Sequence, residues 1–161
     1  MKISSQEEYG LRCLLQLAQL PQGQVVSVKE IAAKEGLSSA YVEKLLRLLS
    51  RAGLVHSMRG MRGGYVLNRP PGQIALGEVV RALGTIQTTT HICSAFTGNQ
   101  AACVHFNDCG LRSVWAGLTG YIQKFLDETT LANLTGSEYA VSERRTSRLS
   151  DCAPSWRKTE S

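Results

Sequence analysis

Two helical patterns separated by a short turn constrain the fold of this chain more than any other feature. Ser27 and Glu30 form a capping-box pattern, which predicts that a short helix begins after Ser27. Gly36 predicts the end of that helix, and a longer helical pattern follows over LSSAYVEKLLRLLSRAG. The positions expected to face the core are Ile31 and Ala32 in the first helix, and Val42, Leu45, Leu46 and Leu49 in the second. A short helix, a turn of about four residues and a longer helix are typical of a helix-turn-helix.

An amphipathic helix precedes this unit. It is predicted to begin after Ser4 or Ser5, with the acidic Glu7 and Glu8 in its first turn, where the positive end of the helix favours them. Its expected inner stripe is Leu11, Leu14, Leu15 and Ala18.

A hairpin pattern follows the second helix. Residues 54–58 and 65–69 can pair as strands across the Gly-rich tip RGMRGG, and residues 76–84 are predicted to form a further helix. We therefore expect a fold that is mainly α with a small β-wing, namely a winged helix-turn-helix followed by a long C-terminal helix.

Positive charge is concentrated in the same part of the chain. The net charge is +5 at pH 7, and the basic excess lies within residues 1–69. No acidic residue lies between Glu43 and Glu78, whereas the basic residues there are Lys44, Arg47, Arg51, Arg59, Arg62 and Arg69. Charge alone would fit an ordinary solvated surface, but a basic patch on a helix-turn-helix indicates contact with DNA phosphates. We expect Lys44 and Arg47 on the second helix, and Arg59 and Arg62 in the wing, to contact double-stranded DNA.

A wide apolar stripe marks a long helix that begins near Gly110. Its members recur at three- and four-residue steps and are Leu111, Val114, Trp115, Leu118, Ile122 and Phe125, with Leu126 beside them. A stripe of this size needs a cover, and a second copy of the same helix would provide one in a homodimer. The alternative is that the helix packs back against its own domain.

The chain is thus divided into three segments. We expect a winged helix-turn-helix DNA-binding domain over residues 1–85, a cysteine loop and dimerisation helix over 86–135, and a disordered tail over 136–161, in which Cys152 has no assigned role. No apolar stretch approaches the roughly 20 residues of a membrane span, and no cleavable signal is visible. We therefore expect a cytoplasmic protein without membrane contact.

Three cysteines, Cys93, Cys103 and Cys109, precede the long helix. Cys109 is expected in the first turn of that helix, after Asn107 or Asp108 as the cap, where the helix end favours a thiolate. The spacing fits neither a zinc ribbon nor a thioredoxin motif, and reduced cytoplasmic thiols argue against a disulfide framework. Three thiolates from one irregular loop suit an iron–sulfur cluster, while zinc and a metal-free thiol switch stay open.

Two other readings of the cysteines can be set apart from this loop. Cys13, inside the N-terminal amphipathic helix, is expected to be a small buried residue. A catalytic cysteine is not expected, because His105 lies only two residues from Cys103 and no orienting acid is evident. The protein is therefore not expected to be an enzyme.

Residues from Met1 to about Leu126 resemble the IscR/NsrR/CymR-type (Rrf-two) family of bacterial transcription regulators. The resemblance rests on MKIS…EYGLRCLLQLA, LSSAYVEKLLRLLSRAGLV, SMRGMRGGYVL, IALGEVVRAL and the late cysteines followed by Trp115. It implies a winged-helix dimer that binds a pseudo-palindromic operator. By the same resemblance, the DNA-contacting residues of the second helix are Ser38, Ser39, Tyr41, Glu43 and Lys44, and the minor-groove arginine is Arg59.

The resemblance also implies an iron–sulfur cluster on Cys93, Cys103 and Cys109, with the two-iron form (2Fe–2S) expected ahead of the four-iron form (4Fe–4S). Some members use a histidine three residues after the last cysteine as the fourth ligand, but Arg112 occupies that position here. Others use an acidic residue in the first helix of the partner subunit, which corresponds to Glu8. His105 is the alternative fourth ligand, and His91 is also open.

The function expected is that of a repressor that senses iron, redox or nitric oxide status through this cluster. The alternative is a cofactor-free regulator of the same fold that responds to thiol oxidation, a small molecule or a protein partner.

Overall fold

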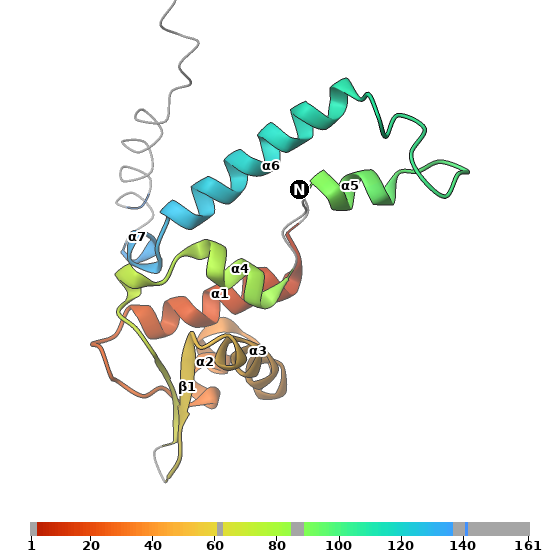
Figure 1. Ribbon diagram of the computed structural model, residues 1–161. Helices are drawn as coiled ribbons and strands as arrows, with labels where there is room; N and C mark the ends of the chain where they lie inside the picture. Colours follow the sequence, from red (N-terminus) through yellow and green to blue (C-terminus); the bar gives the residue numbers. More distant parts are fainter. Residues whose placement is uncertain (1–2, 61–62, 85–88, 137–140, 142–161) are drawn as a thin grey trace, which may run out of the picture.

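The structure is a computed structural model that describes residues 3–60, 63–84, 89–136 and 141. Arg62, and Cys152 with the rest of the predicted tail beyond residue 141, lie outside the described residues. The expected mainly helical fold with a two-stranded wing is confirmed (Figure 1). The helices and strands are α1 (Ser5–Ala18), α2 (Val28–Glu35), α3 (Ser39–Arg51), β1 (Val55–Met58), β2 (Gly64–Leu67), the 3₁₀ turn η1 (Pro71–Gln73), α4 (Leu76–Leu83), α5 (Thr89–Ala95), α6 (Gly110–Glu128) and α7 (Leu131–Leu134).

The helix-turn-helix forms as its local signals predict. Ser27 and Glu30 make the expected capping box at the start of α2, and the two hydrogen bonds to the Glu30 carboxylate from Ser27 lower the pKa of Glu30. Gly36 ends α2 with a φ of 66°, a left-handed conformation that glycine adopts without strain. The inner positions predicted for α2 and α3 are all buried: Ile31, Ala32, Val42, Leu45, Leu46 and Leu49.

The inner face of α1 differs in part from its prediction. Ser4 is the N-cap, and it forms a capping box with Glu7. Leu14 and Ala18 are buried as expected, but Leu11 and Leu15 are only partly buried, and the predicted stripe is wrong to this extent. The face that packs on α3 and α4 is rotated toward Gly10, Cys13 and Leu17. The helix crosses two others rather than one, so its buried face is set by tertiary packing.

Cys13 is a buried residue of the core, as its position in α1 predicted. Its side chain is fully buried, and loss of solvation raises the pKa of its thiol to about 11. A neutral, inaccessible thiol is neither a metal ligand nor a nucleophile.

The wing is an antiparallel hairpin in which Val55 pairs with Leu67 and Met58 with Gly64. A third segment joins its base, because Val26 exchanges two backbone hydrogen bonds with Tyr65, at 3.0 and 2.9 Å. The backbones approach so closely that a Cβ atom on Gly64 would overlap the carbonyl oxygen of Val26. The wing is thereby attached to the segment that leads into α2.

The chain after α6 returns to the core, which the sequence did not indicate. Leu76 N donates to Thr129 O at 2.8 Å, and Leu131 N donates to Ile74 O at 2.9 Å. Leu131, the first residue of α7, is fully buried among the residues of the winged-helix core. The C-terminal end of α6 is therefore fixed to the winged-helix body.

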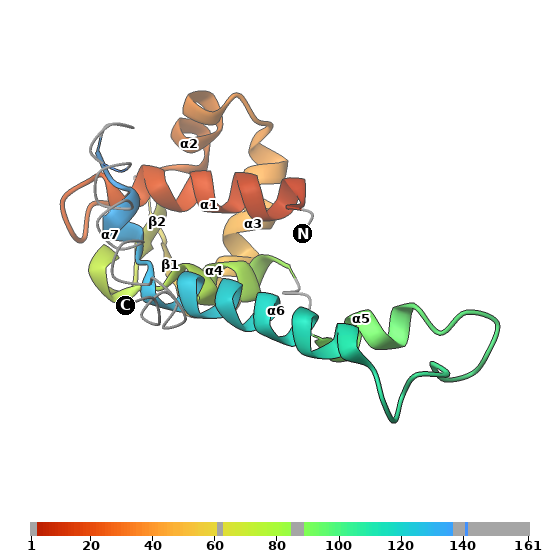
Figure 2. The same cartoon turned by 90° about the horizontal axis from the view of Figure 1, so that it is seen from above.

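The other end of α6 extends away from the body together with α5, and the two views agree on this arrangement (Figures 1 and 2). Near the body, Arg81 of α4 forms an ion pair of 2.9 Å with Asp127 of α6. Within the described residues, no helix is long and apolar enough to span a membrane. We call α5, the connecting residues 96–109 and α6 the arm.

We expect Gly64→Ala to destabilise the domain by about 1–3 kcal/mol, because the new methyl group meets backbone that cannot move aside. Urea unfolding followed by circular dichroism measures the change. Gly72→Ala is the matched control, since a Cβ atom there meets only the Cβ of Ala132, at 3.9 Å. Equal midpoints for the two variants would contradict the close approach at Gly64.

Candidate nucleic-acid interface and cysteine arm

The outer face of α3 presents the polar residues predicted to contact DNA. Ser38 is the N-cap of this helix, and its hydroxyl accepts a hydrogen bond from Tyr41 N at 3.3 Å. Ser39 and Lys44 are exposed. Because Val42 and its neighbours hold the opposite face in the core, these side chains point away from the domain and are free to meet a ligand.

Glu43 and Arg47 are paired on the same face, one helical turn apart. Arg47 Nη2 lies 2.7 Å from Glu43 Oε1, and both side chains are substantially exposed. An exposed pair of this kind contributes little to stability. It does orient the arginine, so a phosphate that approaches Arg47 has to compete with the Glu43 carboxylate. Lys44, beside the pair, forms no ion pair with any described residue and is the more available cation.

Tyr41 is held from behind by the N-terminal half of α1. Its ring meets Tyr9 edge-to-face, with centroids 6.1 Å apart, and the Arg12 guanidinium lies 5.5 Å from the Tyr9 ring centroid. Arg12 is held in turn by Glu35 at the end of α2, at 2.6 Å, and this partner raises the pKa of Arg12. Gln16 donates to the other oxygen of Glu35 at 2.5 Å. These contacts join α1, α2 and the start of α3.

The wing provides Arg59, which is exposed, while Arg62 lies outside the described residues. Arg69, the last residue of the basic run, has a structural position instead. It contacts Glu78 at 2.6 Å and donates to the carbonyl of Gln73 at 3.2 Å. The hydrogen bond from Arg69 is the main cause that lowers the pKa of Glu78. The basic patch that faces solvent is thus smaller than the sequence count suggested.

The three late cysteines all lie on the arm, at different kinds of position. Cys93 lies within α5, so the expectation that it belongs to an irregular loop is wrong. Cys103 lies in the connecting segment. Cys109 is itself the N-cap of α6, with no side-chain capping bond, so the expected placement in the first turn behind an Asn107 or Asp108 cap is also wrong. The helix begins at Gly110, one residue later than a cap at Asp108 would imply and two later than a cap at Asn107.

The chemistry of these cysteines fits a thiolate-bound metal group, but the described residues of one chain do not bring the three together. All three are free thiols of intermediate burial, so all are reachable. Among the described residues, no three His, Cys, Asp or Glu side chains gather closely enough to hold a metal ion. Soft thiolate donors of this kind are suited to iron–sulfur clusters and to zinc.

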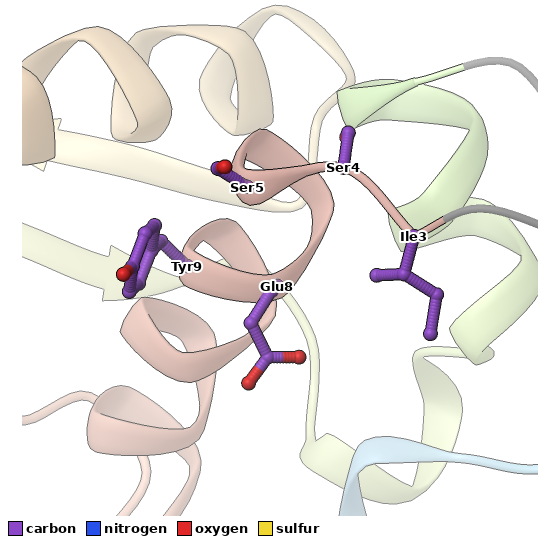
Figure 3. A pocket seen from close by; sticks show the side chains of 5 residues that line it. All are labelled: Ile3, Ser4, Ser5, Glu8 and Tyr9. Carbon is purple, nitrogen blue, oxygen red and sulfur yellow. The ribbon is translucent and has the colours of Figure 1, made fainter.

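The three candidates for a fourth ligand lie in three different parts of the chain. His91 is in α5 and His105 in the connecting segment, and both are exposed. Glu8 is also exposed, and it lines a shallow hollow at the start of α1 with Ile3, Ser4, Ser5 and Tyr9 (Figure 3). Unlike Glu7, whose carboxylate closes the capping box, Glu8 forms no side-chain hydrogen bond with a described residue. Its carboxylate points away from the helix (Figure 3).

The apolar stripe of α6 is uncovered over residues 111–118. No residue of this helix is buried; Leu111 is 64% exposed and Leu118 49%. The predicted stripe residues Val114 and Trp115 are also exposed, whereas Ile122, Phe125 and Leu126 near the body are partly buried.

Sequence reasoning missed Tyr121, Phe96, Val104 and Phe106, which are exposed on the same arm. Only Tyr121 had a signal, because it lies three residues after Leu118 and seven after Val114.

Comparison with known proteins agrees with this geometry. The family model described as Rrf2, iron-dependent transcriptional regulator, matches residues 3–137. A helix-turn-helix-type transcriptional regulator of Synechocystis sp. is 37% identical over 134 residues, which cover 83% of this chain and 87% of that protein. Among solved structures, CymR, the global cysteine regulator of B. subtilis, has a TM-score of 0.68 and 33% identity, covering 83% of this chain and 95% of that one. IscR of T. potens has a TM-score of 0.66 and 34% identity, covering 83% and 85% respectively.

The match covers both the winged-helix body and the arm, and the relatives are transcriptional regulators rather than enzymes. Because the family model matches residues 3–137 and the structure has a helix-turn-helix and a wing, the chain belongs to the Rrf2 family of transcriptional regulators.

Proposed function

We propose that this regulator is a homodimeric repressor that binds a pseudo-palindromic operator and senses iron, redox or nitric oxide status through an iron–sulfur cluster held by Cys93, Cys103 and Cys109. The observation that carries the proposal is the position of these cysteines. Three free, accessible thiols lie on the arm, and the C-terminal end of this arm is fixed to the DNA-binding body. The family description, which names iron dependence, supports it.

DNA binding follows from the exposed side chains of α3 and the wing. In this proposal α3 enters the major groove, where Ser38, Ser39 and Tyr41 reach base edges or phosphates. Lys44 and Arg47 neutralise phosphates, with Glu43 setting the direction of Arg47. Arg59 extends from the wing into the adjacent minor groove. Arg62 is proposed to contact the backbone from the same wing.

Dimerisation follows from the uncovered stripe of α6. A monomer would leave Leu111, Val114, Trp115 and Leu118 in water, and exposed apolar patches of this kind mark interaction sites. A second α6 would cover them and would also cover Tyr121. Two winged-helix bodies would then face inverted half-sites one or more helical turns apart.

The cysteine site is proposed to be completed by Glu8 of the partner subunit, with His105 as the alternative. A bound cluster would supply iron that responds to oxidation or nitric oxide. The free carboxylate of Glu8 lies next to Tyr9, which packs on Tyr41 at the start of α3. Binding of Glu8 to the cluster would therefore displace Tyr9 and Tyr41, which help to position α3.

A second candidate is a cofactor-free regulator of the same fold that responds to thiol oxidation, a small molecule or a protein partner. It is favoured by one observation, namely that the three cysteines are free thiols of intermediate burial, which an oxidant can reach. The similar structure of CymR, a global cysteine regulator, is compatible with it. Iron and sulfide analysis of anaerobically purified protein distinguishes the two, because only the first candidate retains both elements.

Arg59→Ala should weaken binding to a duplex selected by the wild-type protein by about 1–3 kcal/mol, with the larger losses at sites that have an A·T-rich minor groove beneath the wing. Lys44→Ala should weaken binding and reduce the salt slope of log Kd by about 1, if Lys44 contacts a phosphate. Fluorescence anisotropy at several salt concentrations measures both effects. Lys124→Ala on α6 is the charge-matched control and should bind as the wild type does. Unchanged binding in both test variants would refute the proposed interface.

Val114→Glu combined with Leu118→Glu should convert the protein to monomers or insoluble material, because two charges would be buried against the same helix of a second subunit. Sedimentation equilibrium measures the mass. The control carries the same charges at Ser113 and Ala116, which are exposed on the opposite face of α6 by its helical period and should leave the dimer intact. A soluble dimer in the first variant would place the interface elsewhere.

Alanine at Cys93, Cys103 or Cys109 should abolish visible absorbance after anaerobic reconstitution with iron and sulfide. Glu8→Ala should keep the colour but change the spectrum or shorten its lifetime in air, because one donor is lost. Glu7→Gln is the neighbouring control, and we expect a wild-type spectrum. If Glu8→Ala also has a wild-type spectrum and His105→Ala does not, the fourth ligand is His105.

A further inference from the structure

Arg112, in the first turn of α6, contacts the segment between Cys103 and Cys109. Its guanidinium donates hydrogen bonds to the carbonyl oxygens of Phe106 and His105, the latter at 3.5 Å. The guanidinium carbon also lies 5.2 Å from the centre of the Phe106 ring. One side chain thus contacts this segment through two carbonyl groups and an aromatic face.

This segment has few other contacts. Val104 and Phe106 are largely exposed, so no apolar core holds the segment in place. A backbone hydrogen bond from Phe106 N to Cys103 O, at 3.0 Å, closes a turn at the first cysteine of the pair, and Arg112 N donates to Cys109 O at 3.1 Å at the second. Among the described residues, Arg112 is the source of the side-chain hydrogen bonds directed at residues 103–108.

The chemistry of Arg112 suits holding rather than binding metal. A guanidinium stays protonated and offers five donors in a fixed plane with no acceptor, so it cannot ligate iron or zinc. The same plane can donate to adjacent carbonyls while it stacks on an aromatic ring. Charge-assisted hydrogen bonds of this kind are stronger than neutral ones.

We propose that Arg112 is a positioning residue that clamps the Cys103–Cys109 segment onto the first turn of α6. The clamp fixes the segment in the metal-free chain, before any ligand is bound. It reduces the freedom that Cys103 and Cys109 would otherwise lose on binding a common metal group. The effect on metal binding rests on the proposed cluster, whereas the clamp itself does not.

Chymotrypsin tests the clamp without metal, because it cleaves after phenylalanine. Arg112 contacts both the carbonyl group and the ring of Phe106, beside the Phe106–Asn107 bond. The exposed Phe96, on the same arm, forms no hydrogen bond or ring contact with Arg112 and serves as the internal reference. In Arg112→Met we expect the initial cleavage rate after Phe106, relative to that after Phe96, to rise roughly fivefold or more, since local opening becomes easier. Arg112→Lys keeps the charge but loses the planar guanidinium, so its cleavage ratio should lie between those of the wild type and Arg112→Met.

Lys124→Met is the matched control, because it removes one positive charge from the same helix, and its cleavage ratio should equal that of the wild type. Far-ultraviolet circular dichroism establishes that α6 is retained in each variant. A ratio that does not change in Arg112→Met would overturn the clamp, and so would a change of the same size in Lys124→Met.

Reconstitution with iron and sulfide under anaerobic conditions provides a second readout. We expect Arg112→Met to load the cluster more slowly than the wild type, or to lose visible absorbance faster in air, with partial rescue by Arg112→Lys. If the wild type does not load iron while the cleavage ratio rises as expected, the clamp stands and the proposed cluster fails. If all variants load equally and cleave equally, the cluster stands and the clamp fails.

Discussion

The return of the chain from α6 to the winged-helix core determines how the rest of the molecule can work. Two backbone hydrogen bonds, Leu76 N to Thr129 O and Leu131 N to Ile74 O, join the segment after α6 to the start of α4 and the residues just before it. Leu131 is fully buried beside them, and the Arg81–Asp127 ion pair adds a contact at the surface. Without this attachment the arm would be a flexible appendage. With it, the arm is in contact with α4, which packs on both α1 and α3.

The N-terminal half of α1 provides a second connection to α3, the helix proposed to contact DNA bases. Tyr9 packs against Tyr41, and Arg12 links Tyr9 to Glu35 at the end of α2, so three helices meet behind the start of α3. Glu8 lies next to this cluster with its carboxylate exposed. If the partner's arm engages Glu8, as proposed, each arm would connect the two DNA-binding units of the dimer, because one end is fixed to its own body and the other would contact the body of the second subunit. Coupling between two such sites is typically 1–3 kcal/mol.

The parts of the fold that were predictable from sequence are those fixed by local interactions. The capping box at Ser27, the helix start next to Ser4, the left-handed Gly36 and the apolar stripe of α3 are each determined by a few neighbouring residues. The rotated inner face of α1 and the burial of Leu131 depend on contacts between segments far apart in the chain, so no local pattern shows them. The position of Cys109 as N-cap, and the clamp by Arg112, depend on how the loop folds back on α6. At position 112 the family resemblance indicated only that a histidine ligand is missing. The structure shows that Arg112, which stands there instead, contacts His105 and Phe106.

The most direct measurement compares one protein preparation with and without the proposed cluster. Wild-type protein purified anaerobically is assayed for visible absorbance, iron and sulfide, and its affinity for a duplex selected from a randomised library is measured before and after iron is removed by a chelator. We expect a coloured protein that contains both elements and whose affinity changes by about 5- to 150-fold when iron is removed. A colourless protein without iron or sulfide, which binds the duplex equally well after chelation, would contradict the proposed function of the cysteine arm.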